Sequence, residues 1–124
     1  MRSKIQEIER LLLTEGVKDY VGLWSVFWVV RLFISEADPA LVRCIVLTVL
    51  FDLIDAGLIV AGFPTRDGRG FEPWDWGPTE TIRAVQEGLH RLGREPTLGE
   101  IVWFTSTPTG NDIVAEYASS EEVD

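Results

Sequence analysis

Apolar residues recur every three or four positions through the first half of the chain, which predicts three consecutive helices. The first helix is expected over residues 4–15. Ser3 and Gln6 have the spacing of a capping box at its start, and Gly16 is a suitable stop after it.

The second predicted helix, within residues 20–34, is apolar around nearly its whole circumference, which favours a central, buried position. Its charge-free run is too short for a membrane span, which needs about 20 residues, and Arg31 interrupts it. Trp24 and Trp28 lie one turn apart on this helix. We interpret them as core residues, and the alternative is that they form a homodimer interface.

The third predicted helix is bounded by clear signals at both ends. Asp38 can cap its first turn, Pro39 suits the first helical position, and Gly57 is a typical stop. Cys44, the only cysteine, lies in the apolar run of this helix, so we expect it to be a buried and unreactive side chain.

Apolar runs between turn signals in the second half predict three strands, at residues 58–63, 101–107 and 112–117. After the first strand, the Asp67–Gly68 pair favours a hairpin turn. A fourth helix is expected to begin at Pro78 and end at Gly93. The letters "PTGN" between the last two strands favour a turn, so these strands should form a C-terminal β-hairpin.

The predicted fold class is therefore α+β: a winged-helix-like three-helix core with a short β wing, an additional helix and a C-terminal β-hairpin. At 124 residues the chain is long enough to bury a core as one domain. We expect this winged-helix-like domain to cover residues 1–118 and an acidic disordered tail to cover residues 119–124. The resemblance to a winged helix is one of layout and extends over roughly residues 1–75.

The net charge is −9, and it is concentrated in the second half of the chain. Residues 1–62 carry 8 acids and 6 bases, whereas residues 63–124 carry 12 acids and 5 bases. This distribution disfavours nucleic acids and membrane surfaces and favours basic proteins as partners. The third helix, where a winged helix reads DNA, offers one base, Arg43, against Asp52 and Asp55, which argues against direct DNA binding.

The residue types that usually carry catalysis are sparse. His90 is expected on the outer side of the fourth helix, and no serine has a histidine nearby in the sequence. The spacing of histidine, cysteine and acidic residues indicates no metal site, and the glycines match no phosphate-binding loop. We therefore expect neither catalytic residues nor a cofactor or metal. The polar first ten residues indicate no signal peptide, which makes the cytoplasm the expected compartment.

The stretch "FEPWDWGPTE" (residues 71–80) carries the candidate binding residues. We interpret Trp74 as a lid over the core. Trp76 lies on the same side as Trp74 if the stretch is extended, whereas the turn at Gly77 and Pro78 can point it outward, so packing and partner contact both stay open for this side chain. An aromatic anchor surrounded by acids suits a basic protein partner. The predicted partner-binding residues are Glu72, Asp75, Trp76 and Glu80.

The second half of the chain, through "RDGRGFEPWDW" and "GREPTLGEIVWF", resembles small uncharacterised single-domain bacterial proteins. Such proteins are similar in size and acidity to immunity proteins that neutralise antibacterial toxins. The resemblance implies a non-enzymatic protein that occludes a basic toxin. The alternative is a winged-helix regulator that binds DNA or another regulator as a dimer. The final "EEVD" resembles the carboxyl end of eukaryotic cytosolic chaperones, and we interpret that match as chance.

Overall fold

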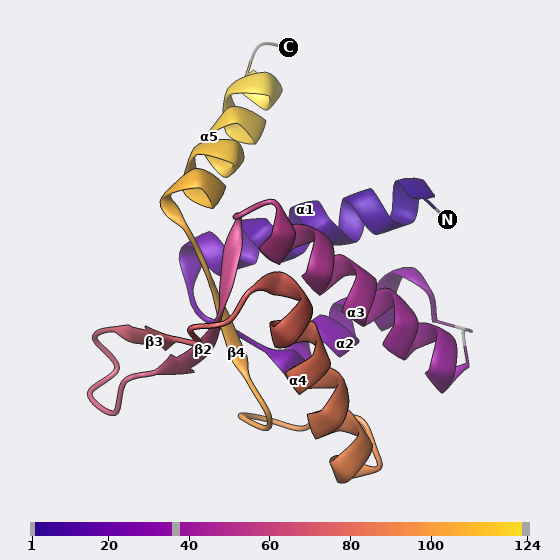
Figure 1. Ribbon diagram of the computed structural model, residues 1–124. Helices are drawn as coiled ribbons and strands as arrows, with labels where there is room; N and C mark the ends of the chain where they lie inside the picture. The colour runs from indigo at the N-terminus through magenta and orange to yellow at the C-terminus, as the bar shows by residue number, and fades with distance from the viewer. Residues whose placement is uncertain (1, 36–37, 123–124) are drawn as a thin grey trace.

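The computed structural model describes residues 2–35 and 38–122, which form five α-helices and four β-strands (Figure 1). This is an α+β fold, as predicted. The elements in chain order are α1 (Arg2–Lys18), β1 (Val21–Gly22), α2 (Leu23–Phe33), α3 (Pro39–Asp55), β2 (Ile59–Pro64), β3 (Phe71–Pro73), α4 (Pro78–Leu92), β4 (Trp103–Ser106) and α5 (Pro108–Glu122).

The strands form one antiparallel sheet in the order β1-β4-β2-β3. Strand β1 lies inside the segment that we expected to be entirely helical. It pairs Gly22 with Trp103, and the backbone N–H of Leu23 donates to the carbonyl of Val102 at 3.1 Å. A Cβ at position 22 would overlap the ring of Trp24, so only glycine fits where the strand turns into α2.

The ends of α3 and α4 follow the capping signals in the sequence, whereas α1 begins at Arg2, before the predicted start at residue 4, and continues through the predicted stop at Gly16 to Lys18. The carboxylate of Asp38 accepts hydrogen bonds from the backbone N–H groups of Ala40 and Leu41 at 2.8 and 3.0 Å. Gly93 ends α4 in the left-handed conformation, with φ of 72°. These contacts satisfy backbone groups that would otherwise lack partners at the helix ends.

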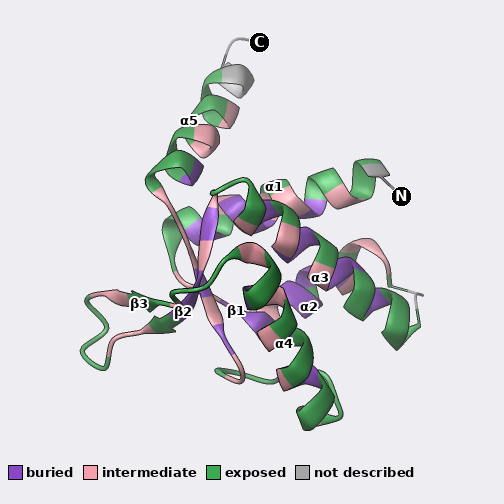
Figure 2. Ribbon diagram, viewed as in Figure 1, coloured by how far each residue is buried: buried purple, intermediate pink, exposed green. Residues whose placement is uncertain are grey.

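Helices α1 to α4 gather around the central strands, and the β2–β3 hairpin and α5 project from this body (Figure 1). Figure 2 shows the buried residues concentrated where the helices meet one another and the sheet. The largest fully buried side chains are Ile8, Leu13, Leu23, Leu50, Leu89, Val26, Val30, Val42, Val46, Val49, Val85 and Val102. No described helix is long and apolar enough to cross a membrane.

The predicted C-terminal β-hairpin is wrong, because residues 112–117 belong to α5. Thr107 caps this helix: its hydroxyl donates to the carbonyl of Gly57 at 2.6 Å and accepts from the backbone N–H of Gly110 at 3.0 Å. The apolar residues that suggested a strand instead form a helical stripe against the core, at Ile113, Val114 and Tyr117.

The expected disordered tail overlaps this helix. Residues 119–122 are part of α5, whereas residues 123 and 124, and with them the end of the "EEVD" match, lie outside the described residues.

Two expectations about burial are also wrong. Cys44 is exposed on α3, and Trp28 on α2 is 63% exposed. Both helices are apolar on several sides, but only some of those sides face a neighbouring element. Trp24 is half-buried and packs edge-on against Trp103, with 5.0 Å between the ring centroids.

Candidate functional site

The β2–β3 hairpin is held by a turn whose polar groups bind one another. The hydroxyl of Thr65 donates to the carboxylate of Asp67 at 2.6 Å and accepts from the backbone N–H of Gly70 at 3.0 Å. The backbone N–H of Arg69 donates to the same carboxylate at 3.0 Å. These two hydrogen bonds, the Thr65 bond first, lower the pKa of Asp67. Gly68 supplies the positive φ, 71°, that this turn requires.

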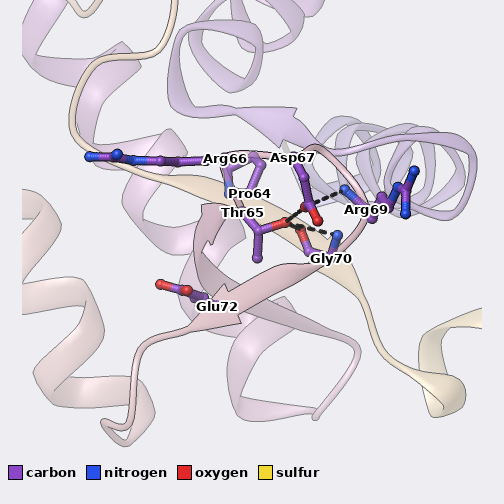
Figure 3. Close-up of a pocket in the computed structure, with 7 residues that line it drawn as sticks. All are labelled: Pro64, Thr65, Arg66, Asp67, Arg69, Gly70 and Glu72. Atoms are coloured by element: carbon purple, nitrogen blue, oxygen red, sulfur yellow. Dashed lines mark hydrogen bonds between the residues drawn. The ribbon is translucent and has the colours of Figure 1, made fainter.

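An open hollow of about 710 Å³ lies against this turn, but its cations do not converge (Figure 3). The side chains of Arg66 and Arg69 point to opposite sides of the turn, and Glu72 lies on the side of Arg66. Because the carboxylate of Asp67 is occupied within the turn, the hollow offers no matched set of groups to a ligand.

Three aromatic rings form a cluster beside the hairpin. The ring centroids of Trp74 and Trp76 lie 4.9 Å apart with a tilt of 50°, and those of Phe63 and Trp74 lie 6.2 Å apart. Trp74 packs against the core, in agreement with its predicted role as a lid. Trp76 is 50% exposed and Phe63 is 41% exposed, so these two rings present apolar area to solvent.

Backbone interactions explain why Trp74 and Trp76 differ in burial. The N–H of Trp74 donates to the carbonyl of Ala61 at 2.8 Å, which extends the pairing of β3 with β2 by one residue. Trp76 comes after this pairing has ended. Gly77, extended with ψ of 174°, and Pro78 then begin α4. Trp76 is therefore half-exposed, and its ring contacts that of Trp74.

The three acids predicted to bind a partner are all exposed: Glu72 in β3, Asp75 in the connection and Glu80 in the first turn of α4. None of them forms an ion pair with another described residue. Glu80 also lies where the α4 dipole favours a negative charge. We call the set Phe63, Glu72, Asp75, Trp76 and Glu80 the hairpin–α4 surface.

Several other acids in the second half of the chain are paired within the molecule. Glu95 accepts from Arg31 at 2.8 Å. Glu100 receives two hydrogen bonds from Arg94, at 2.8 and 2.9 Å. The Arg94 bonds, followed by those from Thr97, lower the pKa of Glu100 to about 2. A partner would have to break these internal contacts in order to bind Glu95 or Glu100. The acids of the hairpin–α4 surface can be reached without that cost.

A half-buried acid was missed by the sequence reasoning. Glu9 on α1 is half-buried beside Asp52 on α3, and its Oε2 atom is buried without a hydrogen-bond partner. Burial, and then the hydrogen bond and negative charge of Asp52, raise the pKa of Glu9 to about 7. The only sequence signal was a glutamate in the middle of an amphipathic helix, next to the buried Ile8.

A second apolar surface lies on α2, where Trp28 and Leu32 are 63% and 57% exposed. They are one helical turn apart and therefore lie on the same face. A hollow of about 330 Å³ between α1 and α2 is lined in part by Trp28 and Tyr20. The spacing of Trp28 and Leu32 was visible in the sequence, but the exposure of that face was not.

The described residues contain no group of three histidine, cysteine or acidic side chains that could hold a metal ion. His90 is exposed on α4, in agreement with its predicted position. Comparisons of the chain with family models, with curated protein sequences and with solved structures find no match. The resemblance to small bacterial proteins of immunity-protein size therefore stays a hypothesis.

Proposed function

We propose that this protein binds a basic protein partner through the hairpin–α4 surface and acts as an immunity or inhibitor protein that occludes a toxin. One observation carries the proposal: Trp76 is half-exposed and in tilted contact with the packed ring of Trp74, and three carboxylates without ion pairs to described residues accompany it in residues 72–80. Interface energy is concentrated in aromatic anchors of this kind, with charged groups at their edges.

The two kinds of residue on this surface contribute differently to binding. Trp76 already rests on Trp74, so little side-chain freedom is lost when a partner covers it. Glu72, Asp75 and Glu80 attract cations over a longer range, which raises the association rate and selects against acidic partners. The net charge of −9 acts in the same direction.

Occlusion is the mechanism that the shape supports. The hairpin projects from the helical body, and its turn is exposed (Figure 2). The acids and aromatic rings lie in the strands of the hairpin and in the segment after it, whereas its turn carries Arg66 and Arg69. The strands and the following segment, rather than the tip, can therefore lie over a basic active or binding site of another protein and exclude its substrate. The acidity and single-domain size of the chain, together with the resemblance of its second half to small bacterial proteins, support the immunity interpretation.

The test compares the protein with Asp75→Ala/Trp76→Ala in affinity capture from lysate of the cells that produce it, at about 0.15 M salt. The matched control is Trp28→Ala/Glu116→Ala, which removes one exposed tryptophan and one exposed acid from α2 and α5. We expect the first variant to lose a captured basic protein that the control retains, with circular dichroism unchanged in both. If the two variants capture the protein equally well, the hairpin–α4 surface is not the binding site.

Capture alone does not establish inhibition, so the captured protein is then expressed by itself and together with the intact chain. We expect the partner to arrest growth when expressed alone, and co-expression of the intact chain to restore growth. Asp75→Ala/Trp76→Ala should fail to restore it. If the partner does not arrest growth when it is expressed alone, the assignment of the binding surface still holds, but the toxin interpretation is wrong.

The second candidate is a winged-helix-like regulator that dimerises through α2. It is favoured by the exposed pair Trp28 and Leu32, because exposed apolar side chains one turn apart are typical of an interface. Three helices followed by the β2–β3 hairpin support this candidate. Sedimentation of the intact protein and of Leu32→Glu tests it: a concentration-dependent dimer that Leu32→Glu abolishes supports this candidate, and a monomer at all concentrations removes it.

A further inference from the structure

Basic side chains from two helices line a hollow between α3 and α4. It has a volume of about 410 Å³ and is lined by Arg43 of α3 and by Arg83, Gln86, Glu87, His90 and Arg91 of α4. We call it the α3–α4 basic hollow. The fold brings these residues together, since Arg43 and Arg83 lie 40 positions apart in the sequence.

Two of the three arginines of this hollow have no ion pair within the part of the chain that the structure describes. Acids outnumber Lys and Arg by 20 to 11 in the chain, yet the guanidinium groups of Arg43 and Arg83 form no ion pair or hydrogen bond with any described residue. The single acid in the lining, Glu87, lies 3.9 Å from Arg91, and both side chains are largely exposed. Such a pair contributes little and remains free to rearrange.

Several other arginines of the molecule are either paired with a carboxylate or point away from one another. Arg31 and Arg94 each hold a carboxylate at 2.8 Å. Arg66 and Arg69 form no ion pair with a described residue either, but Figure 3 shows their side chains on opposite sides of the hairpin turn. In the α3–α4 basic hollow, by contrast, arginines from two packed helices line one space, and its single acid, Glu87, pairs only with Arg91 among the described residues.

We propose that the α3–α4 basic hollow binds a small ligand that carries more than one phosphate group. A guanidinium group donates two parallel hydrogen bonds to a phosphate, and arginines on separate helices can each bind a different phosphate of one ligand. Gln86 and His90 add further polar groups to the same lining. The helices that carry these groups are held by buried contacts of Val42, Val46, Val85 and Leu89.

A compact ligand is favoured over an extended polyanion. The net charge of −9 repels a long chain of phosphates, which must pass over the acidic parts of the molecule. A short ligand lies entirely within the local positive charge. The site shares no residue with the hairpin–α4 surface, so the two proposals stand or fall separately.

Isothermal titration calorimetry with pyrophosphate and with inorganic triphosphate tests the proposal at about 0.15 M salt. We expect saturable binding to the intact protein and a loss of affinity of about tenfold or more in Arg43→Gln/Arg83→Gln. The matched control, Arg66→Gln/Arg69→Gln, removes the same charge from the hairpin turn and should bind as the intact protein does. Thermal unfolding checks that both variants are folded.

Three results would overturn the proposal. The first is no binding of either probe to the intact protein. The second is an equal loss in both double variants, which would show a general effect of net charge. The third is tighter binding of a short poly-glutamate peptide than of triphosphate, which would assign the hollow to carboxylates of a protein partner.

Discussion

Replacing Glu9 by glutamine should make the protein more stable at alkaline pH. Glu9 is half-buried between α1 and α3, its Oε2 atom has no hydrogen-bond partner, and Asp52 lies beside it. Glutamine has nearly the same shape, cannot become negative, and its amide can still donate to the carboxylate of Asp52. The substitution therefore removes the charge and leaves the packing in place.

The magnitude follows from the difference in pKa between the folded and unfolded states. Folding raises the pKa of Glu9 from 4.5 to about 7, so the folded state holds this proton more tightly. The free energy of unfolding must then fall as the pH rises from below 4.5 through about 7. The full difference corresponds to at most about 3.4 kcal/mol. Because Glu9 is partly exposed, screening by water reduces the expected effect to about 1–2 kcal/mol.

The assay is urea unfolding followed by tryptophan fluorescence at about pH 4, pH 6 and pH 8.5. We expect Glu9→Gln to exceed the intact protein in stability by about 1–2 kcal/mol at the highest pH and to match it at the lowest. Glu7→Gln is the control, since it removes the same charge from an exposed position on α1. A stability difference between Glu9→Gln and the intact protein that does not change with pH would refute the reasoning.

Three further predictions concern packing and charge. Gly62→Ala should destabilise the protein by about 1–3 kcal/mol in urea unfolding, because a Cβ there would overlap the backbone of β3. Trp28→Ala should change stability by less than about 1 kcal/mol, whereas Leu50→Ala should cost about 2–5 kcal/mol, since Trp28 is exposed and Leu50 is buried. The lowered pKa of Glu100, about 2, means that its pairing with Arg94 stabilises the fold above pH 4.5 and less as the pH falls towards 2. Glu100→Gln should therefore reduce the acid-induced loss of stability measured between those pH values, and an unchanged acid transition would contradict this assignment.

Elements with strong local signals were predicted close to their observed bounds. Helix α3 begins after its cap at Asp38, α4 runs from Pro78 to Leu92 with Gly93 as its C-terminal cap, and the β2–β3 hairpin turns at Asp67 and Gly68. In each case the signal and the structure that it specifies lie within a few residues of each other. Such interactions depend mainly on residues that are neighbours in the sequence.

The prediction of the C-terminal segment was wrong because its apolar residues fit two periods. In residues 112–117, Ile113, Val114 and Tyr117 are compatible with a strand or with one face of a helix. The helical cap at Thr107 depends on the carbonyl of Gly57, 50 residues away in the sequence. Contact with α1 then favours the helix.

In the candidate site, too, local features could be predicted from the sequence, whereas contacts between distant segments could not. The order of residues in "FEPWDWGPTE" was enough to predict a packed Trp74, but it left Trp76 open between packing and exposure, and the structure shows it 50% exposed. The order of residues could not reveal that Phe63 from β2 would join this surface, since that depends on strand pairing.

Local residue patterns thus determined the helices with strong caps, the hairpin and the aromatic and acidic stretch that follows it. Tertiary packing decided which side of α2 meets water, where Glu9 and Asp52 approach one another, and how Arg43 and Arg83 come to share a hollow. The physical reason is that capping and turn formation act between neighbours in the chain. Burial, by contrast, depends on which surfaces of distant elements meet, and an element that is apolar on several sides does not specify that by itself.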